Sequence, residues 1–232
     1  MKIRWKTALF KLWTEWIRPL LIVLVVLGAF RSAVANWYDV PTGSMKPTIL
    51  EGDRIFVNQL AYDLRVPFTK WRVARWGDPQ RGDIVICHSP ADGKRLVKRV
   101  IAIPGDEIEI RNNRVFLNGQ PLEYGPLDPD IADQLGDGDP LRRLFATERL
   151  GEAVHPIMLT PRQVAPRTLR PISVPPGQYF VMGDNRDQSG DSRVFGFVPR
   201  DEIMGRSSAV VMSLDRSRYY CPRWNRFFHR LD

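Results

Sequence analysis

The feature that most constrains this chain is an apolar run at residues 19–30, in which no side chain is charged. A membrane-spanning helix needs about 20 apolar residues, so the run by itself is too short to cross a bilayer. Extension to residues 16–37 reaches that length, with Arg18 and Arg31 near the ends, where long side chains can reach water. We therefore expect a transmembrane anchor and place it at residues 19–37.

Basic residues dominate the segment before this run, where one acid, Glu15, stands against Lys2, Arg4, Lys6, Lys11 and Arg18. Positive charges mark the cytoplasmic side of a membrane helix. The pattern predicts a cytoplasmic N-terminus at residues 1–18 and a single-pass protein of the cytoplasmic (inner) membrane, with everything after Asn36 on the outer, periplasmic face.

A cleavable signal peptide would show the same pattern, with Ala33-Val34-Ala35 as the small-residue site before Asn36. Arg31 lies in the segment that would precede this site, which argues against cleavage. We favour a retained anchor. Detection of the N-terminal residues by mass spectrometry of the membrane-purified protein would decide between the two interpretations.

The net charge of +8 indicates a polyanionic partner, either a nucleic acid or an anionic membrane surface. No basic nucleic-acid-binding motif is present, so the charge favours an anionic phospholipid membrane. The 232 residues suffice for one split domain or two small ones.

Short segments rich in β-branched residues alternate with glycine-containing turns along most of the remaining chain. This alternation predicts a mainly β protein, with strands at residues 54–57, 83–88, 96–103, 107–110, 114–117, 178–182, 196–199 and 203–213.

Ser44 lies in a stretch that favours a turn, because Gly43 frees the backbone and Pro47 prevents a helix. A serine in such a turn is most often only a turn residue. To attack a carbonyl it needs a base. The three histidines, His88, His155 and His229, lie in no motif that supports a Ser/His/Asp triad, and no SxxK helix is present.

Lys98 is the better candidate for that base. Period two places Leu96, Lys98, Val100 and Ala102 on one face of the predicted strand, and both faces are apolar. A desolvated lysine can lose its proton and act as a neutral base, whereas Arg99 cannot. The alternative is a lysine whose amine reaches water from a strand edge.

The loop at residues 183–193 follows the strand predicted at residues 178–182 and is dense in hydrogen-bonding side chains. It could be an ordinary solvated loop. Its composition also suits a segment that orients a nucleophile and its base.

Four segments in this order resemble characteristic segments of the bacterial type I signal peptidases, the leader peptidase family of Ser/Lys dyad proteases. They are PTGSMKPTILEGD, RGDIVI, VKRVIAIPGD and MGDNRDQSGDSRVFGFVP. The resemblance implies a membrane-anchored endopeptidase that removes signal peptides from secreted preproteins. It also implies an antiparallel β-sheet catalytic domain at residues 38–110 and 176–215, interrupted by a smaller β-containing, non-catalytic insertion at residues 111–175.

The resemblance further implies a role for each matching residue. Ser44 is the nucleophile and Lys98 the general base, and the Ser44 amide and the Thr42 hydroxyl form the oxyanion hole. Ser189 hydrogen-bonds the lysine amine, and the supporting residues around the dyad are Asp191, Arg193, Arg99, Gly183 and Asn185. The enzyme needs no cofactor and no metal. It prefers preproteins with small residues, as in Ala-x-Ala, bound near Val40, Pro41, Met45, Ile49, Leu96 and Val97.

Three segments lie outside this resemblance. Residues 68–76 mix aromatic and basic side chains, which fits buried packing or a membrane-facing loop. The insertion carries Asp128, Asp130, Asp133, Asp137 and Asp139, but their spacing fails the EF-hand pattern and we expect a solvated loop. The basic aromatic tail at residues 216–232 has Trp224, Phe227, Phe228 and Leu231 at helical spacing, which fits a membrane-surface helix or one packed on the body.

Two alternatives remain open to the sequence. One is a dedicated serine/lysine processing protease, of the pilin-maturation or autoprotease type. The other is a membrane-anchored binding module without activity. The sequence allows a bond between Cys87 and Cys221, because their compartment permits disulfides, but does not support it.

Overall fold

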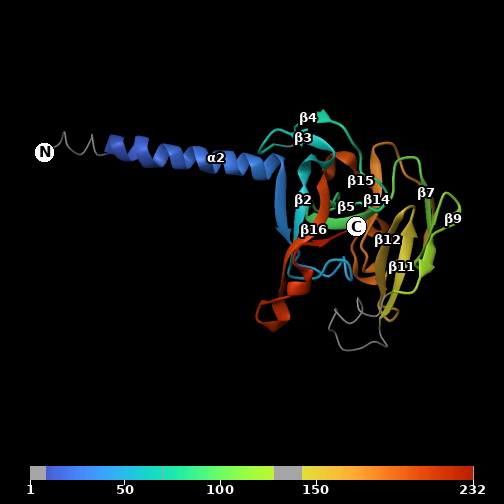
Figure 1. Ribbon diagram of the computed structural model, residues 1–232. Coiled ribbons are helices and arrows are strands. Elements are labelled where there is room, and N and C mark those ends of the chain that lie inside the picture. The colour runs from blue at the N-terminus through green and yellow to red at the C-terminus, as the bar shows by residue number, and fades with distance from the viewer. Residues whose placement is uncertain (1–8, 70, 128–142, 232) are drawn as a thin grey trace.

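The computed structural model describes residues 9–69, 71–127 and 143–231, which form a β-rich body with one long helix projecting from it (Figure 1). The basic residues Lys2, Arg4 and Lys6 lie outside the described residues, as does the aspartate-rich loop of the insertion.

The projecting helix runs from Leu9 to Ala33 and comprises a π-helical turn, η1 (Trp13–Ile17), followed by α2 (Arg18–Ala33). Its 25 residues rise about 37 Å, more than the roughly 30 Å hydrocarbon core of a bilayer. The apolar side chains of α2 are exposed on all sides, among them Leu20 at 59% and Leu27 at 55%. A helix that is apolar all round is stable inside a protein core or in lipid, and this one is outside the core.

The helix ends at Ala33 rather than at residue 37, because the chain then enters β1 (Ala35–Asp39), which pairs with β2 (Asp53–Asn58). The backbone just before β1 is also held, since the Gln59 N–H donates to the Val34 carbonyl at 3.0 Å. The bond after Ala35, where a signal peptide would be cut, therefore lies inside a hydrogen-bonded strand.

The body is organised around a nine-stranded sheet whose main path is β1-β2-β16-β5-β6-β14-β15, with β17 and β18 pairing with β16. All its strand pairs are antiparallel. Its remaining strands are β5 (Ile84–His88), β6 (Arg95–Ala102), β14 (Gln178–Met182), β15 (Val198–Pro199), β16 (Ile203–Asp215), β17 (Cys221–Pro222) and β18 (His229–Arg230).

Two smaller antiparallel sheets form the side of the body away from the helix (Figure 1). One has the order β13-β7-β8-β9, with β7 (Glu107–Arg111), β8 (Arg114–Leu117), β9 (Gln120–Pro121) and β13 (Leu169–Ser173). The other has the order β10-β11-β12, with β10 (Glu123–Gly125), β11 (Leu144–Leu150) and β12 (Ala153–Leu159). β7 pairs with β8 and with β13, so residues 107–111 belong to the four-stranded sheet.

The inserted sheets share a hydrophobic core with the central sheet. Ile101 on β6 and Phe180 on β14 pack in one buried cluster with Ile108, Val115 and Leu150 of the inserted sheets. The insertion is therefore seated directly on the strands that carry and flank Lys98.

The remaining elements are short. A separate two-stranded hairpin consists of β3 (Asp63–Arg65) and β4 (Arg72–Arg75). Single helical turns are η2 (Gln59–Ala61), η4 (Arg186–Gln188), α4 (Ser192–Phe195), η5 (Arg200–Glu202), η6 (Arg216–Arg218) and η7 (Trp224–Arg226).

The mainly β, antiparallel fold class is confirmed, and each strand predicted by range lies within two residues of an observed strand. The helical spacing in the tail is misleading, because residues 224–231 form η7 and β18. Arg226 is buried against Asp53 at 2.6 Å, and Leu231 enters the core. Cys87 is buried and Cys221 exposed, and both are free thiols.

Candidate active site

Ser44 lies in the turn between β1 and β2, and this turn is fastened into the core. Met45 and Ile49, on the same segment, are 1% and 0% exposed and pack in a cluster with residues of β2, β5 and β16. The Lys46 N–H donates to the Gly43 carbonyl at 3.1 Å, which closes the turn around Ser44. The serine itself is half-buried, so its hydroxyl is held in place while remaining accessible.

Lys98 lies in β6, between β5 and β14 in the centre of the sheet, and is 2% exposed. Its Nζ is 2.7 Å from Ser44 Oγ and 3.0 Å from the Val97 carbonyl oxygen. Burial lowers the pKa of the Lys98 amine below its ordinary value, against the opposing attraction of Asp191. A buried amine that is readily neutral therefore lies within hydrogen-bond distance of a hydroxyl.

Two hydrogen-bond donors beside this pair are available to a ligand. Within residues 9–69, 71–127 and 143–231, neither the Ser44 N–H nor the Thr42 hydroxyl makes a hydrogen bond. Thr42 is exposed. An N–H and an O–H without internal partners next to a nucleophile are suited to hold a developing oxyanion.

The loop after β14 holds the Ser44 turn through backbone contacts. The Asn185 N–H donates to the Ser44 carbonyl at 3.1 Å, and Asn185 Nδ2 donates to the Gly43 carbonyl at 3.0 Å. A Cβ added to Gly183 would lie 2.6 Å from Ser189 Cβ and would also clash with the Ser44 carbonyl oxygen, so the close approach requires glycine. The loop thus fixes the main chain on which Ser44 sits.

Two buried ion pairs fix the loop itself. Asp191 accepts from Arg193 Nε and Nη2, each at 2.8 Å, and also from the Gly183 N–H at 3.1 Å. Arg99, next to Lys98, donates to both carboxylate oxygens of Asp184, at 2.9 and 2.8 Å. The expected support network therefore consists of two separate pairs, and Asp184 is a partner that sequence analysis missed.

Ser189 does not make the contact that the resemblance implies. Its hydroxyl is buried beside Gly183, yet it has no hydrogen-bond partner in the described part of the chain, Lys98 included. The lysine amine bonds to Ser44 and to the Val97 carbonyl instead.

The insertion also reaches this loop, which the sequence did not indicate. Arg186 donates to both oxygens of Glu148 on β11, one at 3.0 Å, and both side chains are fully buried. His155 on β12 lies 3.3 Å from the same carboxylate. Next along the loop, the Thr160 N–H donates to Asp187 at 2.7 Å. The sequence around Glu148, His155 and Thr160 does not indicate these contacts, because an acidic residue on a strand with weak hydrophobic alternation is expected to face solvent.

The residues predicted to bind substrate fall into two groups, one buried in the core and one accessible to solvent. Val40, Met45 and Ile49 are core side chains, each at most 3% exposed. The Ser44 turn uses these three side chains to pack against the sheet. Pro41 is exposed, and Leu96 and Val97 are half-buried.

Among the residues that the structure describes, no group of three or more His, Cys, Asp or Glu side chains is placed to hold a metal ion.

Comparison with known proteins places the chain in a family. The family model for signal peptidase, peptidase S26, matches residues 13–212. The chain belongs to this family. Membership makes it a membrane-anchored serine endopeptidase that cleaves signal peptides from exported preproteins, as the sequence predicted.

Individual relatives give the same result. Signal peptidase I of Pseudomonas fluorescens and that of Pseudomonas aeruginosa are each 35% identical, over 84% of this chain and 70% of the relative. Signal peptidase I P of Bacillus subtilis subsp. natto is 34% identical, over 88% of this chain and 92% of its own. A crystal structure of a signal peptidase I from Enterococcus faecalis V583 is 31% identical, covers 56% of this chain and 97% of its own, and superimposes with a TM-score of 0.36.

Proposed function

We propose that Ser44 and Lys98 are the catalytic dyad of this signal peptidase. The observation that supports this most strongly is the 2.7 Å separation of Lys98 Nζ and Ser44 Oγ, combined with the near-complete burial of the lysine. Serine is a weak nucleophile until a base accepts its proton, and a lysine with a lowered pKa can serve as that base.

In the proposed cycle, neutral Lys98 takes the Ser44 proton as Oγ attacks the scissile carbonyl carbon. The Ser44 N–H and the Thr42 hydroxyl stabilise the oxyanion. The Lys98 ammonium then gives its proton to the departing amine, which leaves an acyl-enzyme on Ser44. Lys98 next activates a water molecule that hydrolyses the ester, and Ser44 is restored.

The proposed substrates are preproteins with small residues before the cut, as in Ala-x-Ala. Pro41, Leu96 and Val97 are the accessible apolar residues near the dyad, with the buried Met45 and Ile49 beneath the Ser44 turn. In this proposal these residues form shallow apolar pockets that accept methyl-sized side chains and exclude larger ones.

We place the reaction on the outer face of the cytoplasmic membrane. The basic N-terminal segment supports a cytoplasmic N-terminus, and the body follows α2 on the opposite side. The net charge of +8 supports contact with anionic phospholipids. We also propose that the non-catalytic insertion starts at Glu107 and serves to hold the loop after β14.

The test is preprotein cleavage by the purified full-length chain with Ser44→Ala, Lys98→Ala and both changes together. Each single change should lower the cleavage rate by roughly 10³-fold or more, and the double change should lower it no further, because the two groups act as a unit. Lys94→Ala is the matched control, since Lys94 lies near the start of β6 with 77% of its side chain exposed. Cleavage at the parental rate by either single variant would show that Ser44 and Lys98 are not the catalytic dyad.

A further inference from the structure

One edge of β6 is free up to Lys98 and occupied beyond it. β14 pairs with β6 from Arg99 onward, and no described strand pairs with residues 95–98 on that side. In the proposed function, the substrate residues before the cut lie near Leu96 and Val97, so the chain after the cut heads toward Arg99. Because β14 fills the edge there, that chain must turn outward over the loop after β14.

The loop after β14 has a small exposed face. Of residues 183–192, only Gln188 and Gly190 are exposed. Gln188 Nε2 donates to Gln163 Oε1 at 2.7 Å, and Gln163 belongs to the connection between β12 and β13, residues 160–168. A chain that crosses the exposed face therefore meets this connection, which we call the β12–β13 loop.

The β12–β13 loop lies within a few residues' reach of the Ser44 turn. Asn185 Nδ2 donates to the Gly43 carbonyl at 3.0 Å and to Gln188 Oε1 at 3.3 Å. Because Gln188 in turn donates to Gln163 through the same carboxamide, Gln163 Oε1 lies within about 11 Å of the Gly43 carbonyl oxygen. An extended peptide covers that distance with about three or four residues, at roughly 3.3 Å each.

The β12–β13 loop is held in one shape. Arg167 Nη2 donates to the carbonyls of Thr160, Pro161 and Gln163, at 3.1, 2.9 and 2.7 Å. Arg167 Nε donates at 3.0 Å to Asp187, which belongs to the loop after β14. The surface of the β12–β13 loop is therefore presented at a fixed place beside the loop after β14.

This surface offers one apolar and one cationic side chain. Val164 is fully exposed, and Arg162, on the other side of Gln163, is also exposed. Arg162 makes no ion pair with any residue that the structure describes. An exposed, unpaired guanidinium is suited to bind a carboxylate, because its N–H donors match the two carboxylate oxygens.

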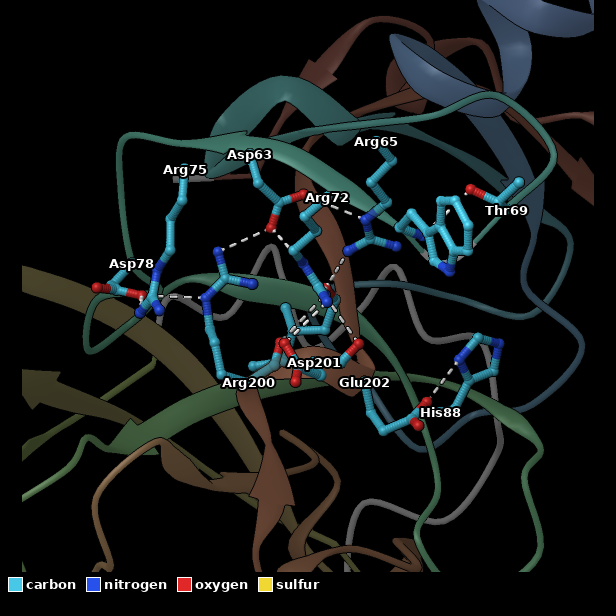
Figure 2. A network of polar contacts seen from close by, with 12 residues as sticks. Asp63, Arg65, Thr69, Arg72, Arg75, Asp78, His88, Arg200, Asp201 and Glu202 are labelled. Carbon is cyan, nitrogen blue, oxygen red and sulfur yellow. Dashed lines mark hydrogen bonds and ion pairs between the residues drawn. The ribbon is translucent and has the colours of Figure 1, made fainter.

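The arginines on the β5 side of β6 are, by contrast, already paired with acids. Asp63 accepts from Arg72 Nε and from Arg200 Nη2, each at 2.9 Å (Figure 2). At the end of β5, His88 Nδ1 lies 3.1 Å from Glu202 Oε2. This flank therefore carries paired charges, whereas the β12–β13 loop carries an unpaired one.

We propose that the β12–β13 loop binds the part of the preprotein that follows the cleavage site. Val164 contacts this extended segment, and Arg162 binds an acidic side chain at about the third or fourth residue after the cut. The placement rests on the proposed function, because the dyad and the pockets near Leu96 and Val97 fix where the chain leaves the site. The insertion thereby selects among preproteins by the start of their mature part.

The first test varies the charge on both partners. Preproteins with Asp or Lys at successive positions on either side of the cut are cleaved by the purified full-length chain, and kcat/KM gives the Asp-to-Lys ratio at each position. The parent should favour Asp roughly three- to fivefold at about the third or fourth residue after the cut, as expected of one partly exposed ion pair. Arg162→Glu should reverse this preference. Arg170→Glu, at a second exposed arginine of the insertion, should keep the parental preference.

Equal ratios in the parent and in Arg162→Glu at every position after the cut would overturn the proposal. So would an equal change in Arg170→Glu, or an effect of Arg162→Glu on charges before the cut alone. Failure of the proposed dyad gives a different result, which is parental cleavage by Ser44→Ala, and it leaves the charge ratios measurable.

The second test detects the contact without turnover. A preprotein with a single cysteine at successive positions after the cut is bound to the full chain carrying Ser44→Ala, Cys221→Ser and Val164→Cys. A mild oxidant then forms a disulfide where the two thiols meet, and the buried Cys87 does not compete. Val154→Cys is the matched control, since Val154 is 45% exposed near the other end of β12.

The disulfide should form with Val164→Cys when the preprotein cysteine is about the third or fourth residue after the cut, and not with Val154→Cys. Equal crosslinking of the two variants would overturn the proposal. A preprotein that copurifies with the enzyme but crosslinks to neither variant would overturn it as well.

Discussion

Lys98 depends for its chemistry on where β6 places it. A lysine in water keeps its proton at neutral pH, and here burial between β5 and β14 lowers the pKa of the amine. Arg99, the next residue, is equally buried, and its guanidinium donates two hydrogen bonds to the Asp184 carboxylate. Two neighbouring basic residues on one strand therefore lie in different environments. Arg99 forms an ion pair with Asp184, and Lys98 contacts the Ser44 hydroxyl.

The lowered pKa predicts how activity and stability depend on pH. Cleavage should rise with pH as Lys98 deprotonates, with its midpoint below the ordinary lysine value of 10.5. The unfolded chain holds the lysine proton up to that ordinary value, so between the two pKa values it binds more protons than the folded chain. Folding stability should therefore increase with pH by about 1.4 kcal/mol per unit in this window.

Lys98→Met tests this prediction, because a neutral side chain of similar length removes the titration. The variant should be inactive, should be more stable than the parent at neutral pH, and should lack the rise in stability. Urea midpoints across pH give the measurement, with the exposed Lys94→Met as control. If the difference in unfolding free energy between the parent protein and Lys98→Met does not change with pH, the pKa of Lys98 is not lowered.

At the scale of elements, the β11–β12 hairpin of the insertion acts as a buttress for the catalytic loop. Arg186 is fully buried and its charge is balanced by Glu148. Burial by itself would raise the pKa of Glu148, but the Arg186 guanidinium, through its charge and its hydrogen bonds, and the nearby His155 ring hold that pKa below the usual range. Arg186 follows Asn185, whose N–H donates to the Ser44 carbonyl, so the Arg186–Glu148 pair is one residue away from the contact that holds the Ser44 backbone.

Glu148→Gln should therefore affect both stability and catalysis. It leaves a buried guanidinium without a counter-charge, which costs about 3–5 kcal/mol of folding free energy. We expect a lower urea midpoint and a lower kcat with little change in KM. Glu152→Gln, on the exposed turn of the same hairpin, should stay within about 0.5 kcal/mol of the parent. If Glu148→Gln matches Glu152→Gln in both measurements, the buttress is absent.

At the scale of the whole molecule, distant parts of the chain meet around Ser44. The turn after β1 supplies the serine, β6 the lysine and the loop after β14 the backbone support. The C-terminal segment packs against the end of the Ser44 turn and the start of β2, because Arg226 pairs with Asp53 at 2.6 Å and donates to the Thr48 carbonyl at 3.0 Å. The tail is thus part of the catalytic body, whatever its exposed aromatic residues contact.

Arg226→Ala tests this closure. The change leaves Asp53 buried without its cation and should lower the free energy of unfolding by about 3–5 kcal/mol. Cleavage activity should fall with it, because the freed Thr48 carbonyl adjoins the Ser44 turn. Thermal unfolding and preprotein cleavage measure the two effects, and Arg230→Ala, an exposed neighbour on β18, serves as control. A purely lipid-binding tail would instead leave unfolding in detergent unchanged in both variants.

The sequence by itself determined the anchor helix and the strands of the central sheet, because apolar length, period-two alternation and turn residues are local properties. It also indicated the family, through the resemblance of four short segments. It also selected Ser44 and Lys98 as candidates through their immediate neighbours. Only the tertiary structure decided which charges pair. The chain contains several acidic residues that could pair with Arg99, and nothing in the residues around Glu148 indicates that it is buried against Arg186. It likewise decided that the tail is not a helix and that the β3–β4 hairpin lies against α2, where the Phe68 N–H donates to Ser32 Oγ. Those outcomes depend on contacts between residues far apart in the chain, and no window of neighbouring residues contains them.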